Sequence, residues 1–460
     1  MKKMNTLLEN AAQRAGTYLD NLSSRPVAPT PEAVSRLAAF DYPLQNDPLN
    51  PAEVLRELDE IGSPATIASA GPRFFGFVIG GSLPVALAAN WLAGAWDQNS
   101  ALYNVTPGTA AIEQVALHWL LDVLRLPGEC AGAFVTGTTV ANFTALAAAR
   151  HAALEKAGWN VEADGLFGAP PLEVIVSAEA HPTLLKAIAM LGMGRDRAIR
   201  VPTDKNGAMR ADALPALSER SVVCVQAGNI NTGAFDPLPE ICAAARKAGA
   251  WVHVDGAFGL WAAASPSLAR LAEGIDHADS WATDCHKWLN VPYDSGVAFV
   301  RDTNALRAAM SITADYLPTA SEYRNPADFT PELSRRARGV EVWAALRALG
   351  RSGIADLMER TCRYARRFAS AMSSAGYEVL NEIVLNQVLV SFGSPDTTRQ
   401  IVSDIQADGT CWCGSTVWQG KTAMRISIVS WATTESDVDR SIEAILRIAQ
   451  SSKKKHANGS

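Results

Sequence analysis

The chain has 460 residues, of which 48% are hydrophobic and 19% charged, and its formal net charge is −6. This composition is that of an ordinary globular protein, so the length predicts two or three domains around a large buried core. The acidic balance argues against partners that bind through phosphate groups, namely nucleic acids and anionic membrane surfaces.

Seven scattered cysteines fit reduced thiols better than a disulfide framework, because their number is odd. Cys411 and Cys413 have the wrong spacing for a zinc knuckle, so no metal site is expected. The first residues lack the apolar core of a signal peptide, and the longest apolar stretch, residues 83–96, is shorter than a membrane span. These features predict a cytoplasmic protein that does not bind a membrane.

Residues 1–74 are predicted to form a helical N-terminal arm. Segments 31–40 and 51–62 each open with a proline and carry a glutamate in the first turn, as helix starts often do. No strand pattern occurs in this region, so we interpret it as an appendage or a dimerisation arm.

Residues 75–340 are predicted to form a large α/β domain, because short apolar runs alternate there with helical stretches. The runs lie at residues 132–137, 172–177, 221–228, 250–259, 280–284 and 296–301. Apolar, β-branched strands separated by crossover helices favour a mainly parallel sheet that is covered on both faces. Ligands of such sheets bind beyond the carboxyl ends of the strands.

Residues 341–450 are predicted to form a smaller α+β domain that begins with a long amphipathic helix. Its strand candidates are residues 388–393 and 423–430. Residues 451–460 are polar and basic, and they are expected to form a flexible tail.

The most informative feature is the pair Asp255 and Lys287. Asp255 ends the predicted strand in HVDGAFG, and Lys287 follows the next strand in DCHKWLN. Pyridoxal 5′-phosphate needs both groups, since its aldehyde condenses with a lysine amine and its ring nitrogen stays protonated beside a buried carboxylate. Alone, a strand-end aspartate is usually a turn residue and a lysine is usually solvated. Together they predict a site for this cofactor.

Through these HVDGA and HKW motifs, residues 70–440 resemble the pyridoxal-phosphate-dependent group II amino acid decarboxylases. The resemblance implies fold type I, the aspartate aminotransferase-like fold, with a mainly parallel sheet in the large domain. It also implies that Lys287 forms the Schiff base with the cofactor and that Asp255 is the partner of the pyridine nitrogen. Ala257 resembles the small residue that packs against one face of the ring.

His181 lies four residues after the predicted strand 172–177. It is similar to the family histidine that stacks on the other face of the cofactor, where an imidazole can also donate a hydrogen bond or a proton. The alternative interpretation is a histidine that caps a helix near the surface.

Gly137, Thr138 and Thr139 lie between a predicted strand and a helix, where N–H groups and hydroxyls suit a dianion. They resemble the phosphate loop of the family, although Thr138 replaces the more usual glycine. The resemblance implies phosphate contacts from His286 and from Ser280.

Two further segments bear on the cofactor. Asn142 lies one turn into the helix that follows the phosphate loop, where it would brace that loop. Ile230 occupies the place of a threonine in aromatic decarboxylases, and the neighbouring Asn231 is a candidate for the missing polar contact.

Tyr316 is similar to a tyrosine that the family carries on a mobile loop and that protonates the substrate Cα after CO₂ is lost. Its presence favours simple decarboxylation over aldehyde-forming chemistry. A packed loop tyrosine is the alternative interpretation.

The substrate pocket is expected near residues 72–82 and 96–103, which resemble pocket segments of the family. The candidate residues are Phe77, Trp96, Asn99 and Tyr103. The resemblance also implies a homodimer whose active sites are shared across the interface.

We therefore predict a decarboxylase that converts an L-amino acid, most favourably an aromatic one, to its amine and CO₂. The aromatic substrate follows from pocket segments that are apolar and contain no cationic cluster. Another reaction of the same cofactor remains the alternative: a C–C lyase or aldolase, a decarboxylative oxidase or an aminotransferase. A catalytically silent cofactor-binding protein is disfavoured, because Lys287, Asp255, His181 and Tyr316 are all present.

Overall fold

The computed structural model describes residues 2–312 and 323–458, and the chain divides into two compact units. The central unit comprises residues 80–366 and 381–388. The terminal unit comprises residues 1–79, 367–380 and 389–460. The domain boundary expected near residue 340 lies inside the central unit, which continues to residue 366.

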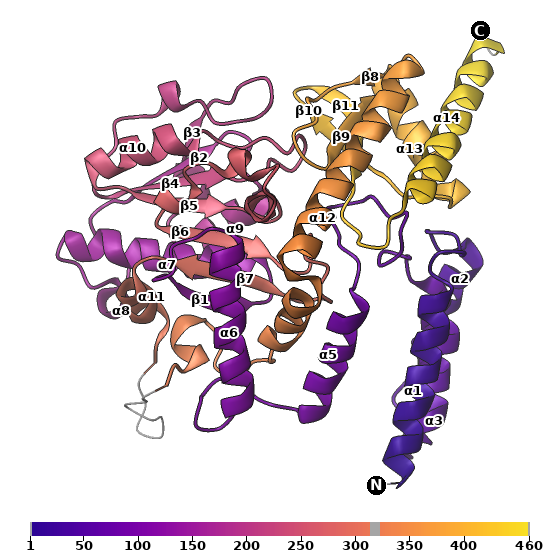
Figure 1. Ribbon diagram of the computed structural model, residues 1–460, viewed down its shortest axis with the longest axis horizontal. Coiled ribbons are helices and arrows are strands. Elements are labelled where there is room, and N and C mark those ends of the chain that lie inside the picture. The colour runs from indigo at the N-terminus through magenta and orange to yellow at the C-terminus, as the bar shows by residue number, and fades with distance from the viewer. Residues whose placement is uncertain (1, 313–322, 459–460) are drawn as a thin grey trace. The chain divides into compact units, whose positions relative to one another are not determined.

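The described part of the central unit contains a seven-stranded sheet with the order β1-β7-β6-β5-β4-β2-β3 (Figure 1). The strands are β1 (Ala131–Val135), β2 (Glu173–Ser177), β3 (Ile199–Val201), β4 (Ser221–Gln226), β5 (Trp251–Asp255), β6 (Ser280–Asp284) and β7 (Gly296–Val300). β6, β5, β4, β2 and β3 run parallel, whereas β7 runs antiparallel to both β1 and β6. The predicted mainly parallel α/β sheet is confirmed.

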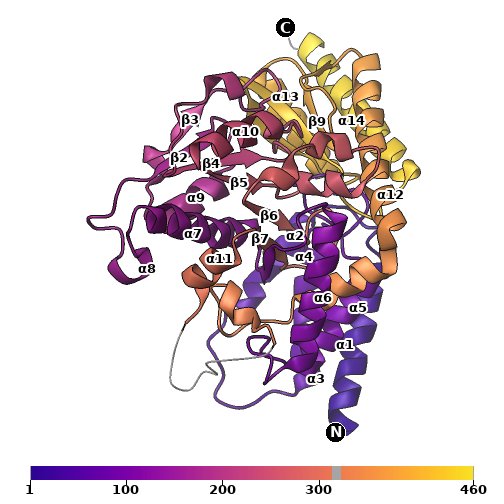
Figure 2. The same cartoon turned by 60° about the vertical axis from the view of Figure 1, so that its left-hand side comes forward.

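Helices cover both faces of this sheet, which is why its strands are apolar on both sides. α7 (Thr138–Lys156) and α9 (Pro182–Met190) lie on one face, and α10 (Leu238–Ala248) lies on the other (Figures 1 and 2). α7 is rich in alanine, and its Ala141 packs with Ala282 of β6 and Ala298 of β7 in a buried cluster. These small side chains let α7 approach the sheet closely.

The central unit also contains α5 (Pro84–Trp96), α6 (Pro107–Val123), α8 (Val161–Asp164), α11 (Thr303–Met310) and most of α12 (Gly339–Ser374). α5, α6 and α9 begin at a proline, whose fixed φ suits the first helical position. α12 is interrupted at Gly350, which has φ 59° and ψ −179°. The predicted amphipathic helix near residue 340 is therefore two helical segments that meet at this glycine.

The terminal unit joins the N-terminal helices to a second sheet. Its helices are α1 (Lys2–Asp20), α2 (Pro31–Ser35), α3 (Pro51–Glu57), α4 (Ser63–Ala65), α13 (Pro395–Asp408) and α14 (Glu435–Asn458). Buried Arg73 links the two parts of the chain, because it donates to the carbonyls of Thr410 and Ser23 and pairs with Asp437 at 3.2 Å. The N-terminal arm is therefore packed within a unit rather than appended to one.

The second sheet has the order β10-β11-β9-β8. Its strands are β8 (Glu378–Val379), β9 (Gln387–Ser391), β10 (Gly414–Trp418) and β11 (Lys421–Ser427). β9 and β11 are the two predicted strands, while β8, β10 and β3 of the central sheet were not predicted from the sequence. α14 continues to Asn458, into the segment that the sequence predicts to be a flexible tail. Of the helices that the structure describes, none has both the length and the apolar character needed to cross a bilayer.

Candidate active site

The candidate site lies at the carboxyl ends of β5 and β6. Asp255, the last residue of β5, pairs in register with Ala282 of β6, and the backbone N–H of Asp284 donates to the carbonyl of Ala257 at 3.0 Å. The turn that carries Lys287 follows directly after β6. The structure thus places Asp255 and Lys287 at adjacent strand ends on one edge of the sheet.

Lys287 is held by a carboxylate that sequence reasoning missed. Its Nζ lies 2.9 Å from Oδ2 of buried Asp284, whose Oδ1 accepts the backbone N–H of Thr138 at 2.6 Å. Burial alone would raise the pKa of Asp284, but Lys287, His286 and the Thr138 N–H together hold the pKa below its usual value. The signal available in the sequence was an acidic residue at a strand end, three positions before the lysine.

His286 lies beside this ion pair. Its Nδ1 accepts the backbone N–H of Ser295 at 3.1 Å, and its Nε2 lies 3.7 Å from Oδ2 of Asp284. Burial lowers the pKa of His286, against the opposing effect of Asp284. The ring of Tyr293 stacks on the imidazole with centroids 4.3 Å apart and is itself 55% exposed. Tyr293 was not among the predicted residues, although it lies only six positions after Lys287.

The predicted phosphate loop lies against the same residues. A Cβ on Gly137 would lie 3.2 Å from Cε1 of His286, and a Cβ on Gly296 would lie 2.5 Å from Cα of Gly137. Gly296 is therefore needed for this close approach of the loop to β7, and a side chain at position 137 would be crowded by His286. Thr138 begins α7, and its buried hydroxyl has no hydrogen-bond partner among the described residues. Thr139 is the next residue of the helix and is partly exposed.

Asp255 is buried, and both of its carboxylate oxygens accept hydrogen bonds. Oδ2 accepts from Nδ2 of Asn142 at 3.1 Å, and Oδ1 accepts from the backbone N–H of Ala257 at 3.2 Å. Ala257 is partly exposed although its neighbours on both sides are buried. Asn142 therefore braces the aspartate, a contact that the sequence did not reveal.

Ser280 does not belong to the predicted phosphate site. It begins β6 and pairs in register with His253, so it lies toward the amino end of the strand. Its fully buried hydroxyl contacts Nδ1 of His253 and Nε1 of Trp251, both at 2.9 Å. This placement corrects the expectation of a phosphate contact, because the hydroxyl is enclosed within the helix-covered face of the sheet.

His181 caps a helix in this structure, which is the alternative weighed for it above. It precedes α9, and its Nδ1 lies 2.6 Å from the hydroxyl oxygen of Thr183 and 3.3 Å from the backbone nitrogen of the same residue. The cap fixes the ring orientation, and stacking on the cofactor remains a prediction.

The turn after β4 contains Asn231 and contributes two amide groups to the carboxyl edge. The backbone N–H of Asn231 donates to Oδ1 of Asn229 at 2.8 Å. Nδ2 of Asn229 and Nε2 of Gln226 are buried and have no hydrogen-bond partner among the described residues. Because Gln226 pairs in register with Asp255, an unsatisfied donor lies on the strand next to the aspartate. In the sequence, the feature that could have revealed Gln226 is a polar residue at the end of an apolar run.

The glycine pair at residues 80–81 packs against the turn that carries Lys287. A Cβ on Gly80 would lie 1.9 Å from the carbonyl oxygen of Lys287, and the N–H of Gly81 donates to Oδ1 of Asn290 at 2.7 Å. Only a residue without a side chain fits at position 80. Residues 80–81, which belong to the predicted pocket segment, therefore support the turn that carries Lys287.

Asn99 and Tyr103 contact residues 323–335. Oδ1 of Asn99 accepts the backbone N–H of Arg335 at 3.0 Å, and the Tyr103 ring stacks on Tyr323 with centroids 4.1 Å apart. Tyr316 lies outside the described residues. The structure therefore shows loop packing for Asn99 and Tyr103, and their substrate role remains a prediction.

The other two pocket candidates are exposed aromatic residues. Trp96 is the last residue of α5. Phe77 belongs to the terminal unit, has φ 53°, and lies with its ring 5.5 Å from that of Trp412. Neither observation tests the predicted role of Trp96 and Phe77 in substrate binding.

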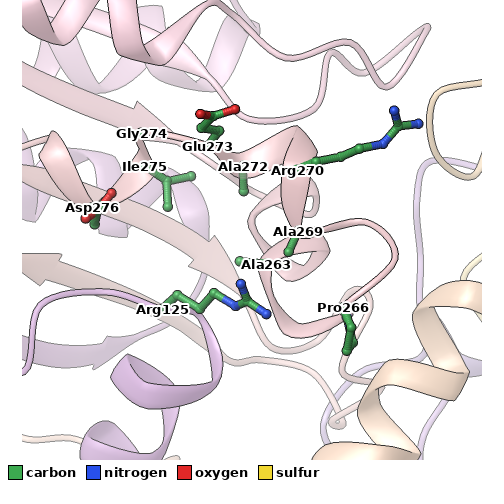
Figure 3. A pocket seen from close by; sticks show the side chains of 10 residues that line it. All are labelled: Arg125, Ala263, Pro266, Ala269, Arg270, Ala272, Glu273, Gly274, Ile275 and Asp276. Carbon is green, nitrogen blue, oxygen red and sulfur yellow. The ribbon is translucent and has the colours of Figure 1, made fainter.

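A hollow of about 490 Å³ lies at a different place in the central unit (Figure 3). Its lining consists of Arg125, Ala263, Pro266, Ala269, Arg270, Ala272, Glu273, Gly274, Ile275 and Asp276. Residues 274–276 precede β6 and Arg125 precedes β1, so this hollow lies toward the amino ends of these strands. It is separate from the site at the carboxyl edge.

The chain is similar to known proteins over most of its length. Residues 31–393 match the family model described as the pyridoxal-dependent decarboxylase conserved domain. The chain is 25% identical to the aromatic-L-amino-acid decarboxylase of Bacillus atrophaeus, over 94% of this chain and 92% of the relative. It is 29% identical to the L-2,4-diaminobutyrate decarboxylase of Rhizobium meliloti (strain 1021), over 81% and 77% of the two chains.

Solved structures share the fold. The structure of Oryza sativa TDC with PLP and tryptamine has a TM-score of 0.90 at 22% identity and covers 98% of both chains. Mouse CSAD has a TM-score of 0.87 at 22% identity and covers 98% of this chain and 99% of its own. The expected fold type I is therefore confirmed.

The residues at the carboxyl edge fit pyridoxal phosphate, the cofactor of the matched family. The edge offers an amine on Lys287, a carboxylate on Asp255 and an unpartnered buried hydroxyl on Thr138 at a helix start. These are the groups that the aldehyde, the pyridine nitrogen and the phosphate of this cofactor need. By its match over residues 31–393 and by this donor set, the chain is a member of the pyridoxal-dependent decarboxylase family.

Proposed function

We propose that this decarboxylase acts on an aromatic L-amino acid and releases the corresponding amine and CO₂. The observation that carries the substrate class is the half-exposed ring of Tyr293, which lies on His286 next to Lys287 and offers an aromatic surface at the site. The names of two relatives, aromatic-L-amino-acid decarboxylase and tryptophan decarboxylase, agree with this choice.

Charge also favours an aromatic over an acidic substrate. Recognition of a side-chain carboxylate needs a cation with donors to spare. Arg324 and Arg335, which follow the undescribed segment, both pair with buried Glu113, at 3.2 and 2.6 Å. Arg338 pairs with Asp294 at 2.8 Å. The charges of these arginines are therefore balanced by carboxylates of the chain itself, although Nε of Arg335 and Nη1 of Arg338 have no hydrogen-bond partner among the described residues.

The cofactor, when bound, supplies a cationic ring that accepts the electrons of the Cα–carboxylate bond. Lys287 would hold its aldehyde, and Asp255 would pair with the ring nitrogen. Ala257 and His181 would contact the two faces of the ring, and Thr138 and His286 would donate to the phosphate. Asp255, Thr138 and His286 are buried, which keeps bulk water away from these three groups and strengthens their interactions.

The proton that replaces the carboxylate at Cα comes from Tyr316 in this proposal. The assignment rests on the sequence resemblance, because Tyr316 lies outside the described residues. A phenol suits the role because it is a weak acid that gives up its proton only to a strong base such as a developing carbanion.

The experiment that tests the function is a product balance with individual L-amino acids. We expect an aromatic amino acid to give amine and CO₂ in equal amounts, without ammonia, aldehyde or peroxide. Measurement of all five products separates decarboxylation from oxidase, lyase and transaminase chemistry. Turnover without CO₂ would contradict the reaction, and turnover of only acidic or diamino acids would contradict the substrate class.

We also propose that the protein is a cytoplasmic homodimer with active sites shared across the interface. α5 supports this assembly, because it is 13 residues long and exposes Val85, Trp91, Leu92 and Trp96. Aromatic side chains gathered on one helix are typical of the buried centre of an interface. The seven cysteines are all free thiols, in agreement with a reducing compartment.

The dimer can be tested on α5. Replacing Trp91 and Leu92, which are 47% and 57% exposed, with glutamate is expected to give a folded monomer of much lower activity, because charges are disfavoured at an interface core. Light scattering measures the mass. Phe167 is 98% exposed and lies apart from α5 in sequence, so Phe167→Glu serves as the matched control and should remain a dimer. A wild-type monomer with full activity would overturn the proposal.

A further inference from the structure

One face of the central sheet carries a line of buried polar side chains that leads to Asp255. Side chains alternate between the faces of a strand, so Trp251, His253 and Asp255 of β5 share one face. Ser280 of β6 lies beside His253 in register, and Asn142 reaches over from α7. The close approach of α7 to the sheet, which its alanines allow, brings the short amide of Asn142 within reach of both His253 and Asp255.

Four hydrogen bonds connect these five side chains. Nε1 of Trp251 and Nδ1 of His253 each lie 2.9 Å from Oγ of Ser280. Nε2 of His253 lies 2.9 Å from Oδ1 of Asn142, and Nδ2 of Asn142 lies 3.1 Å from Oδ2 of Asp255. All five residues are buried. The line is therefore shielded from bulk water.

The two ends of the line fix the direction of every bond in it. An indole N–H can only donate and a carboxylate can only accept. Asn142 must therefore donate to Asp255 and accept from Nε2–H of His253. The Nδ1 of His253 then accepts the hydroxyl proton of Ser280, whose oxygen accepts from Trp251. Burial lowers the pKa of His253 to about 3, so the imidazole is neutral and has one proton for this arrangement.

We propose that Asn142, His253, Ser280 and Trp251 form a one-directional hydrogen-bond chain that positions the Asp255 carboxylate toward the cofactor's ring nitrogen. Asn142 and His253 are positioning residues, since they act through Asp255. This inference depends on the family's cofactor and is independent of the substrate class.

The reversed arrangement is disfavoured by an unsatisfied donor. If Asp255 carried a proton on Oδ2 and donated it to Asn142, the amide would turn and His253 would become a donor at Nδ1. Ser280 would then receive two N–H groups, and its own hydroxyl proton would have no acceptor in the chain. A buried donor without a partner costs about 1–3 kcal/mol. The hydrogen-bond chain therefore favours the direction in which Asp255 is the final acceptor.

The direct test is the tautomer of His253 in the holoenzyme, measured by nitrogen NMR of histidine-labelled protein. The resonance is assigned by its absence from His253→Gln. We expect a neutral imidazole with its proton on Nε2. The Ser280→Ala variant removes the donor to Nδ1, so we expect its His253 to lose the strong preference for this tautomer. A proton on Nδ1 in the wild type, or an imidazolium, would overturn the proposal.

A second test measures the link to the cofactor. Asn142→Leu removes the donor to Asp255, and the dissociation constant for pyridoxal phosphate should rise about 10- to 100-fold, the loss expected for one hydrogen bond to a charged group. Thr283→Val is the matched control. Thr283 lies on the other face of β6, and its buried hydroxyl has no partner among the described residues.

The control should leave the dissociation constant unchanged and the visible absorbance of the bound cofactor at its wild-type position. The absorbance of Asn142→Leu should shift, because the ring nitrogen loses a fixed anionic partner. Equal affinities and spectra for Asn142→Leu and Thr283→Val would overturn the proposal. If Asn142→Leu does not fold, the tautomer of His253 in the wild type and in Ser280→Ala decides the matter. Neither measurement depends on which amine the enzyme makes.

Discussion

Replacing Lys287 with alanine is expected to remove the visible absorbance of the bound cofactor and nearly all activity. The amine of Lys287 is the covalent attachment point in this proposal, and its Nζ is 2.9 Å from Asp284 in a side chain that is only 18% exposed. Losing a covalent nucleophile lowers turnover by about 10⁴-fold or more. Absorbance after dialysis and amine production measure the two effects. Visible absorbance retained by the variant would refute the assignment of Lys287.

Lys287→Arg is the matched control, because it keeps the positive charge beside Asp284 but offers no amine that can condense with an aldehyde. Lys287→Ala leaves a buried carboxylate without its partner, and such a loss costs about 3–5 kcal/mol. The arginine variant should therefore be as inactive as the alanine variant but more stable. Urea unfolding without added cofactor compares the two variants on equal terms.

The pH dependence of that difference in stability follows from Asp284. With a cation beside it, the Asp284 carboxyl has a lower pKa in the folded state than in the unfolded state. The carboxylate therefore stabilises the fold at any pH above its unfolded-state pKa. This stabilisation is lost as the pH falls through the lowered folded-state pKa. In Lys287→Ala, burial opposes the charged form. The difference in unfolding free energy between Lys287→Arg and Lys287→Ala should therefore be largest at neutral pH and become smaller in acid. A gap that stays constant with pH would argue against the ion pair as its cause.

The strands of the central sheet could be predicted from the sequence because each is short, apolar and bounded by turn residues. Their parallel order then fixed where Asp255 and Lys287 had to lie, since the carboxyl ends of parallel strands meet at one edge. β3 and β8 were missed because two or three residues give no periodic signal. A long helix that starts near residue 340 was anticipated, but its interruption at Gly350 was not.

The partners of the site residues could not be predicted, because hydrogen bonds between residues far apart in sequence depend on how closely the elements pack. The approach of α7 to the sheet brings Asn142 to Asp255, 113 positions away. The same packing encloses Ser280, which its motif alone placed at the phosphate. Asp284 was overlooked because an acidic residue beside an expected phosphate is electrostatically unfavourable unless a lysine and a histidine lie next to it.

Replacing Asp255 with asparagine should lower turnover by about 10²–10³-fold, the scale for removing one preorganised charge from a buried site. A neutral amide has no charge with which to hold a cationic ring nitrogen. The cofactor should still attach through Lys287, so visible absorbance persists at a shifted position. Steady-state kinetics should show the loss in kcat rather than KM. A kcat close to that of the wild type would remove Asp255 from its assigned role.

The contacts of Asp255 explain why an amide is a poor substitute even apart from charge. Oδ1 accepts from Ala257 and Oδ2 accepts from Asn142, so an NH₂ group at either position faces another donor. Some loss of stability is therefore expected together with the loss of turnover, and a control must separate them. Buried Asp236 accepts backbone N–H groups from Met209 and Gln226, both at 2.7 Å, and has no assigned role in the site. Asp236→Asn should lower the unfolding free energy to a similar extent yet retain kcat, because its carboxylate serves only the fold. If both variants lose turnover in proportion to stability, the effect at Asp255 is structural.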